Sequence, residues 1–413
     1  MSQPFNSRLA ARTKTLTSSA IREILKVATR PDITSFAGGL PAPELFPVAE
    51  IKAATARILE REPVKSLQYG PTDGMPELRA WVAAEVSRVE AEACAAAGLP
   101  APAPVTVDMV MMTTGSQQSL DLISKLLIDA GDGVVVEAPS YLGALQAFTL
   151  YQPRYSTVAM DEEGARAEAL AAALATGPKL TYLLPTFQNP TGRTMSVARR
   201  LEVAEVVRSA GVPLVEDDPY GALYYGTPPG PSLRSLAPDL TLSLGTFSKT
   251  LAPGLRIGWL IGPPEVVARL IQLKQSADLH TSSLAQYVAH EVVTAGVLPG
   301  HLEKLRTVYA ERRDAMLGAI ESEFPAGMTW TRPTGGMFVW AKLPNGVEAA
   351  GLLPICVEQE RVAFVPGAPF HADGTGRDTL RLNFTHAPAS VIRDGVSRMA
   401  RVLRRALEEA VPA

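Results

Sequence analysis

The chain has 413 residues, enough for two domains and a large hydrophobic core, and 20% of them are charged. Its formal net charge of -3 gives no electrostatic reason to expect nucleic acid or an anionic membrane as a partner. No segment has the run of about 18 apolar residues that would span a bilayer. The two cysteines, Cys94 and Cys356, lack a CxxC spacing, so we expect no disulfide framework, no structural zinc and a cytoplasmic protein.

The N-terminal part combines an arm with short elements. Residues 1 to about 17 contain no apolar signal core, and Ser18 or Ser19 can cap a short helix. Gly38 and Gly39 then indicate a sharp turn or a close approach of the backbone to another group. Further helices are predicted over residues 48–61 and 76–98.

From Val105 to about Gly262 the pattern changes to short apolar segments separated by helices. Continuous apolar strands that alternate with helices predict a mostly parallel sheet that is covered on both faces. Such a sheet binds ligands at the carboxyl ends of its strands. We therefore expect four polar residues that follow apolar strands to lie close together, namely Ser116, Asn189, Asp217 and Lys249.

The remainder of the chain predicts a second, smaller unit. A long helix is expected over 298–324, then strands in MTWTRP, GGMFVWAKLP, VAFVPGAPF and TLRLNFTHA, then a closing helix over 389–410. This pattern predicts an α+β domain that the N-terminal segment joins. We place the N-terminal arm and small-domain segment at residues 1–60, the large domain at 61–296 and the small domain at 297–413.

The segment LSLGTFSKTLAPGLRIGWLIG places Lys249 between two apolar strands. An unpaired buried ammonium is costly, so the alternatives are a lysine whose head reaches solvent and a functional lysine. The hydroxyls of Thr246 and Ser248 and the cation of Arg256 indicate an anion pocket beside it. Together these residues suit a lysine that forms a Schiff base with pyridoxal phosphate.

Other residues can meet the remaining needs of this cofactor. Asp217 in VEDDPY can hold the pyridine nitrogen protonated, with Asp218 as a rival. Tyr220 and Asn189 can donate to the phenolate oxygen, although Asn-Pro-Thr-Gly also favours a plain turn. Tyr141 can stack on the ring or be an ordinary core tyrosine.

Anion contacts are expected at two more places. Ser116 and Gln117 begin a helix after a strand, where N–H groups and a hydroxyl can bind phosphate; a plain N-cap serine is the alternative. Arg381 in LRLNFTHA can form a fork-shaped contact with a substrate carboxylate, or a buried salt bridge. GxxxxGK[ST], HExxH and GxSxG motifs are absent from the sequence, and its five histidines lack a metal-ligand spacing, so we expect no metal.

These motifs resemble those of one family, the class I/II aminotransferases of pyridoxal-phosphate fold type I. The resemblance runs from about Ser18 to the C-terminus and is carried by QYGPTDGMPELR, TTGSQQSLDL, APSYLGAL, PTFQNPTG, VEDDPY, GTFSKTLAPGLRIGW, PTGGMFVW and LRLNFTHA. It implies an α/β fold whose large domain has a mostly parallel, seven-stranded sheet covered by helices. It also implies a smaller α+β domain built from both termini.

The resemblance also implies residue roles. Lys249 would form the Schiff base and move protons as general base and acid, while Arg381 would bind the substrate's α-carboxylate. Tyr69 would reach the phosphate in the neighbouring subunit, which implies a homodimer with shared active sites. The ring contacts would be Asp217, Tyr220, Asn189 and Tyr141. The phosphate contacts would be Ser116, Gln117, Ser248, Arg256 and Thr246, the last at a position where relatives often have serine.

Within the family, AIREILK followed by SFAGGLPAPELFP is similar to the 2-aminoadipate and kynurenine/aminoadipate aminotransferases. This likeness implies that Arg22 contacts the distal carboxylate of an acidic substrate. It also implies that Gly38, Gly39 and Leu40 line the substrate pocket. We expect ping-pong transfer to 2-oxoglutarate from 2-aminoadipate, with aromatic or branched-chain amino acids or glutamate as further donors. The alternatives are a lyase or decarboxylase on the same fold, and a regulator that only retains the cofactor.

Overall fold

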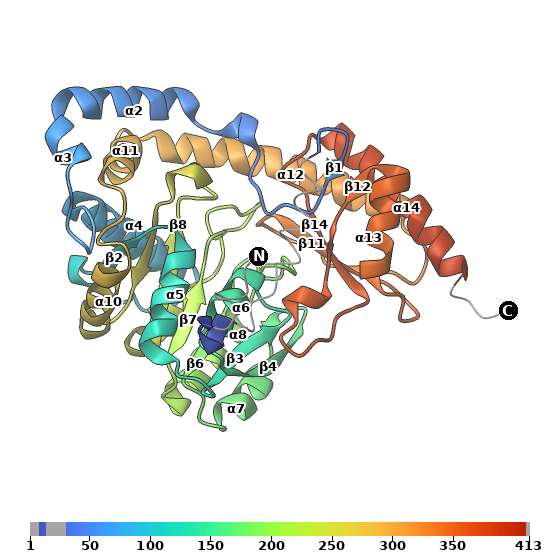
Figure 1. The fold of residues 1–413 in the computed structure, drawn as a ribbon, viewed down its shortest axis with the longest axis horizontal. Coiled ribbons are helices and arrows are strands. Elements are labelled where there is room, and N and C mark those ends of the chain that lie inside the picture. Colours follow the sequence, from blue (N-terminus) through green and yellow to red (C-terminus); the bar gives the residue numbers. More distant parts are fainter. Residues whose placement is uncertain (1–7, 14–29, 410–413) are drawn as a thin grey trace.

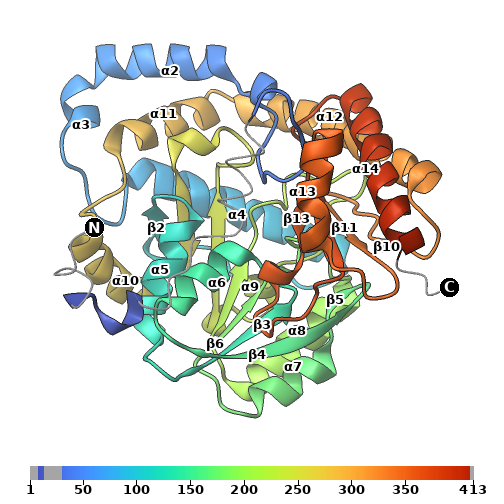
Figure 2. The ribbon, with the colours of Figure 1, turned by 45° about the vertical axis from the view of Figure 1, so that its right-hand side comes forward.

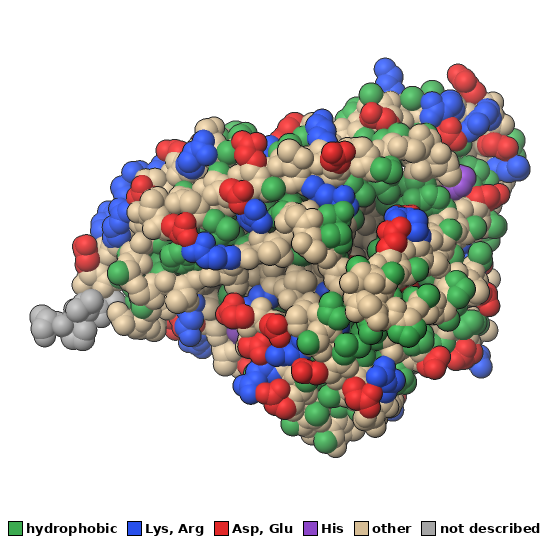
Figure 3. Space-filling view, turned by 180° about the vertical axis from the view of Figure 1, so that it is seen from behind, with side chains coloured by type: hydrophobic (Ala, Val, Ile, Leu, Met, Phe, Trp, Pro, Cys, Tyr) green, Lys and Arg blue, Asp and Glu red, His purple; other side chains and the backbone are tan. Residues whose placement is uncertain are grey.

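The computed structural model describes residues 8–13 and 30–409 (Figure 1). The predicted cap at Ser18 or Ser19, and with it Arg22, lies outside the described residues. No helix within the described ranges is both long enough and apolar enough to cross a bilayer. Acidic and basic side chains are interspersed over the face of the molecule that Figure 3 shows.

The larger sheet has eight strands. In chain order they are β2 (Val110–Thr113), β3 (Gly133–Ala138), β4 (Arg154–Asp161), β5 (Gly164–Ala165), β6 (Leu180–Leu183), β7 (Leu214–Asp217), β8 (Thr241–Thr246) and β9 (Gly258–Ile261). Their order across the sheet is β2-β9-β8-β7-β6-β3-β4-β5. The pairs from β8 through β7, β6 and β3 to β4 are all parallel, and β5 adds only two residues at one edge. The predicted mostly parallel sheet is therefore confirmed, with the two-residue β5 as an eighth strand beyond the seven expected.

Strand β9 is the exception inside this sheet, because it runs antiparallel to both of its neighbours, β2 and β8. A parallel connection needs a crossover of a dozen or more residues, usually a helix. The link from Thr246 to Gly258 holds only a short 3-10 turn, so the chain returns in the opposite direction. This link carries Lys249 and Arg256 at the carboxyl end of β8.

Helices cover both faces of the large sheet, as the continuous apolar strands predict (Figure 2). One face packs against α5 (Ser116–Leu127), α6 (Leu142–Thr149) and α10 (Pro264–Ala277); the other packs against α7 (Ala167–Leu174) and α8 (Val197–Ala210). Side chains of β3 alternate between the two, with Val134 and Val136 in one cluster and Val135 in the other. Each face of the large sheet therefore packs into its own hydrophobic cluster, and this packing fixes the positions of the strand ends.

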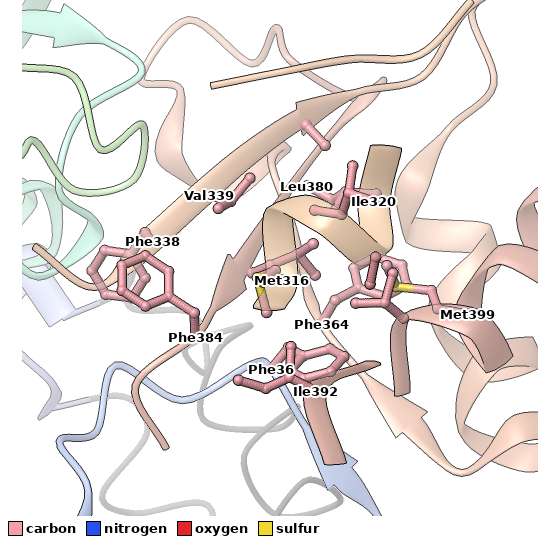
Figure 4. Close-up of a cluster of buried hydrophobic side chains, with 14 of the residues drawn as sticks. Phe36, Met316, Ile320, Phe338, Val339, Phe364, Leu380, Phe384, Ile392 and Met399 are labelled. Atoms are coloured by element: carbon pink, nitrogen blue, oxygen red, sulfur yellow. The ribbon is translucent and has the colours of Figure 1, made fainter. Parts of the chain in front are cut away.

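The smaller sheet has the order β10-β11-β14-β13, and all of its pairs are antiparallel. These strands are β10 (Thr329–Trp330), β11 (Phe338–Lys342), β13 (Val365–Pro366) and β14 (Thr379–Asn383). Helices α12 (Val297–Glu323), α13 (Ala349–Glu360) and α14 (Ala389–Glu409) pack with them. Figure 4 shows the shared core, in which Met316 and Ile320 of α12 meet Met399 of α14. This arrangement confirms the smaller α+β unit.

The N-terminal segment joins this smaller unit, as predicted. Strand β1 (Thr34–Ser35) pairs in parallel with β12 (Val362–Ala363), and Phe36 packs into the cluster of Figure 4. The expectation of one strand in VAFVPGAPF is wrong, because β12 pairs with β1 whereas β13 pairs with β14. The remaining helices are α2 (Val48–Arg61), α3 (Pro63–Leu67), α4 (Pro76–Ala96), α9 (Leu233–Leu236) and α11 (Ser283–Thr294). The domain limits at residues 60 and 296 stay a prediction.

Candidate active site

A cavity of about 350 Å³ lies at the carboxyl ends of β6, β7 and β8. It brings together Ser116, Asn189, Asp217 and Lys249, as their positions after apolar strands predict. The full lining is Gly39, Ser116, Gln117, Tyr141, Leu142, Gly143, Gln146, Leu184, Asn189, Asp217, Pro219, Tyr220, Thr246, Ser248, Lys249, Pro253, Arg256 and Arg381.

Lys249 presents its amine to this cavity. Its Nζ donates a hydrogen bond to the Gly39 carbonyl oxygen at 2.8 Å. Burial, together with the cations of Arg381 and Arg256, lowers the pKa of Lys249 to about 8. On the order of one tenth of the amine is therefore neutral at pH 7, and the neutral form is the one that nucleophilic attack and proton uptake both require.

Asp217 is the last residue of β7, and only 2% of it is exposed. Its Oδ2 accepts a hydrogen bond from the Tyr182 hydroxyl at 2.7 Å, while Oδ1 is buried without a partner among the described residues. Burial raises the pKa of this carboxyl to about 7. The rival Asp218 does not line the cavity and accepts instead from the Gly221 N–H at 2.7 Å. Asp217 is thus the carboxylate that can meet a protonated ring nitrogen.

A second hydrogen-bonded group also lines the cavity. Asn189 Nδ2 donates to the Tyr220 hydroxyl at 3.3 Å, and its Oδ1 accepts from Arg381 Nη1 at 2.9 Å. The Arg381 guanidinium stacks 4.2 Å from the ring centre of Phe338 and 5.0 Å from that of Phe370. Burial lowers the pKa of Arg381 to about 10, so it stays a cation. Among the described residues no carboxylate lies within 4.0 Å of it, so the salt-bridge alternative is not realised there.

The start of α5 forms an anion-binding turn with Arg256. Gly115 is the N-cap residue, with φ of 74°, so the simple N-cap interpretation of Ser116 is wrong. A Cβ at Gly115 would lie 2.5 Å from Arg256 Nη2, which itself donates to the Thr114 carbonyl oxygen at 3.1 Å. In the same cavity Thr246 Oγ1 donates to Ser248 Oγ at 2.9 Å. Free N–H groups, hydroxyls and a guanidinium thus converge where a phosphate can bind.

Tyr141 lines the cavity, and Gly143, two residues later in the chain, leaves room for its ring. A Cβ at Gly143 would lie 2.4 Å from the Tyr141 ring, and the Gly143 carbonyl oxygen accepts from Gln117 Nε2 at 2.9 Å. The sequence reasoning missed both Gly143 and Tyr182. A tyrosine inside the otherwise apolar segment LTYLLP was the available signal for the second.

Some predicted residues lie elsewhere. Tyr69 is predicted to reach the cavity of a neighbouring subunit, which a single chain does not test; it is 77% exposed and packs edge-on against His280, with 5.6 Å between ring centres. Of the glycine loop, only Gly39 lines the cavity, whereas Gly38 and Leu40 line a neighbouring one of about 570 Å³. Arg22 lies outside the described residues, so its predicted contact is not tested.

Comparison with known proteins agrees with this geometry. The family model "Aminotransferase class I and II" matches residues 36–398, so the chain belongs to that family. It is 45% identical to the 2-aminoadipate transaminase of Thermus thermophilus, over 94% of each chain. It is 42% identical to aromatic-amino-acid aminotransferase 1 of Thermococcus litoralis, over 95% of this chain and 93% of the relative. A crystal structure of the Thermus thermophilus α-aminoadipate aminotransferase, complexed with N-(5'-phosphopyridoxyl)-L-leucine, has a TM-score of 0.88 and 42% identity, and covers 98% of this chain and 99% of that one.

The chain is therefore a pyridoxal-phosphate-dependent aminotransferase. The described residues fit that cofactor. The partnerless Oδ1 of Asp217 awaits a donor such as a pyridinium N–H. The amine of Lys249 has a lowered pKa, and Arg256 brings a cation to the start of α5.

Proposed function

We propose that this aminotransferase moves the amino group of 2-aminoadipate to 2-oxoglutarate by a ping-pong mechanism. The observation that carries the proposal is the placement of the Lys249 amine in one cavity with Asp217 and Arg381. The similarity to a 2-aminoadipate transaminase supports the choice of donor. Branched-chain amino acids are a second candidate class of donor, because the crystallised relative is complexed with a pyridoxyl-leucine. Aromatic amino acids are a third, because the Thermococcus relative is an aromatic-amino-acid aminotransferase.

In this proposal the chain's residues divide the work. When bound, the cofactor supplies an electron sink for the charge that develops at the substrate's α-carbon. Asp217 holds the ring nitrogen, Tyr220 and Asn189 hold the phenolate oxygen, and Tyr141 covers the ring. The phosphate is held by Ser116, Gln117, Thr246, Ser248 and Arg256.

Lys249 and Arg381 act on the substrate. The guanidinium of Arg381 orients the α-carboxylate by a two-pronged contact, for which its buried Nε has no partner among the described residues. The Lys249 amine acts as a general base and takes the proton from the substrate's α-carbon. As a general acid it then gives the proton back in the second half of the 1,3-proton shift. Its lowered pKa supports this role, because the neutral amine is the form that accepts a proton.

The Lys249→Ala variant tests the activity itself. We expect loss of amino transfer to 2-oxoglutarate by about a thousandfold or more, as removal of a general base and nucleophile predicts. Lys125→Ala, which removes a surface ion pair with Asp121, is the matched control and keeps activity. Retained transfer in Lys249→Ala would contradict the assignment. In the wild-type enzyme, release of ammonia or carbon dioxide instead of glutamate formation would favour the lyase or decarboxylase.

A screen of amino donors with 2-oxoglutarate tests the substrate. We expect the highest kcat/KM for 2-aminoadipate. Arg22→Ala should raise KM for 2-aminoadipate and glutamate more than for leucine, because only the first two carry a distal carboxylate. Equal effects on all three donors would remove Arg22 from substrate selection.

We further propose a cytoplasmic homodimer with shared active sites. The exposure of Tyr69, together with 75% exposure of Val64 and 67% of Leu67, supports a partner surface near α3. The buried free thiols of Cys94 and Cys356 support a reducing compartment. Sedimentation should give a mass twice the chain's 43.9 kDa, and Leu67→Asp should yield monomers with weakened cofactor binding. A monomeric wild-type protein with full cofactor affinity would contradict this proposal.

A further inference from the structure

Lys274 on α10 is a fully buried lysine outside the cavity lining. Its side chain is 0% exposed, and its Nζ donates to Asp278 Oδ1 at 2.8 Å and to Gln118 Oε1 at 2.9 Å. Lysines are almost never buried completely unless they are paired, and a buried ion pair contributes little net stability. The further hydrogen bonds of Asp278 and Gln118 show which segment of the chain this ion pair holds in place.

The pair is bonded to the turn that precedes α5. Gln118 Oε1 also accepts from the Thr114 backbone N–H at 2.8 Å. Asp278 Oδ2 accepts from Gln118 Nε2 at 2.6 Å and from Thr114 Oγ1 at 3.2 Å. Thr114 is thus held through its backbone and its side chain, and its carbonyl oxygen accepts from Arg256 at 3.1 Å. A continuous set of hydrogen bonds runs from Lys274 to Arg256.

The turn has little room to compensate for a displacement. Gly115 follows Thr114 in the left-handed region at φ of 74°, and a Cβ there would lie 2.5 Å from Arg256. The Gly115 N–H donates to Thr113, the last residue of β2, at 2.8 Å. A shift of Thr114 would therefore move both the first N–H groups of α5 and the guanidinium of Arg256.

We propose that Lys274, Asp278 and Gln118 are positioning residues for the phosphate group of the cofactor. They do not line the cavity; they fix the turn that offers its N–H groups and Arg256 to the phosphate. The inference rests on the proposed phosphate contacts at Ser116 and Arg256. It predicts an effect on the phosphate group in particular, and not on the pyridine ring.

Lys274→Met in the full chain tests this role. Met has a similar length, and Asp278, with 28% of its side chain exposed, can be hydrated once its partner is gone. We compare the affinities of the apoenzyme for pyridoxal phosphate and for pyridoxal, which lacks the phosphate, by equilibrium dialysis. Affinity for pyridoxal phosphate should fall by about tenfold, as loss of a hydrogen bond to a charged group predicts, and affinity for pyridoxal by less than about twofold.

Two further variants separate the possible failures. Lys125→Met, at a lysine paired with Asp121 on α5, should change neither affinity. Arg256→Met should selectively weaken binding of pyridoxal phosphate; if it does not, the proposed phosphate site is wrong. If Arg256→Met does and Lys274→Met weakens both ligands equally, or neither, the positioning role is overturned. Asp278→Asn gives the same comparison should Lys274→Met fail to fold.

Discussion

Arg381→Lys tests whether the buried guanidinium recognises the substrate's α-carboxylate. Lysine keeps the positive charge but loses the planar fork and the stacking against Phe338 and Phe370. At least one of two parallel bonds to the carboxylate is lost. A hydrogen bond to a charged group contributes about 1.5–3 kcal/mol, and about 1.4 kcal/mol corresponds to a factor of ten. We therefore expect kcat/KM to fall by about 10- to 100-fold for an amino acid.

The decisive comparison is between leucine and 3-methylbutylamine, the same molecule without its carboxylate. The rate of amino-group uptake in a single turnover, measured over a range of concentrations, gives kcat/KM for each. Only the value for leucine should fall, while that for the amine changes by less than about threefold. Arg199→Lys, at an arginine paired with Asp161 at 2.9 Å and outside the cavity lining, controls for the general cost of the exchange. Equal losses for leucine and the amine would refute the carboxylate contact.

Three other substitutions act on groups around the cavity. Tyr182→Phe removes the bond to Asp217, which lowers the pKa of that carboxyl, so the pKa of Asp217 should rise and kcat should fall by about tenfold in steady-state assays. Burial raises the pKa of Glu137 to about 8, so wild-type stability should decrease as pH rises from the ordinary carboxyl range through 8. In Glu137→Gln that decrease should be smaller in melting curves. Gly143→Ala should displace the Tyr141 ring and weaken cofactor binding several-fold in dialysis, with unchanged circular dichroism.

The position of the site could be predicted from the sequence because parallel strands end at a common edge. Asn189, Asp217 and Lys249 are far apart in the chain, yet each follows an apolar strand, and all three line one cavity. The sequence could not rank Asp217 above Asp218. Tertiary position decides between them, since Asp217 completes β7 and lines the cavity whereas Asp218 accepts from the Gly221 N–H in the following turn.

The missed features depend on register and on tertiary packing. Tyr182 reaches Asp217 because β6 and β7 pair with Tyr182 opposite Val215, and a shift by one residue would reverse the side chain. Helix α13 was not predicted, and Pro354 inside it lacks the N–H that an interior helical residue donates. Burial of Leu352 and Cys356 in the smaller core offsets that loss.

The charges in the cavity explain why cofactor and substrate are needed to complete the site. Lys249, Arg256 and Arg381 present three cations, and no carboxylate lies within 4.0 Å of them in the described chain. Asp217 offsets only part of this charge, because burial raises its pKa to about 7 and the carboxyl is partly protonated near neutral pH. Burial, and then repulsion by the cations of Arg381 and Arg256, lowers the pKa of Lys249, which keeps its amine reactive. In the proposed function, a phosphate beside Arg256 and an α-carboxylate beside Arg381 are the anions that would relieve this repulsion.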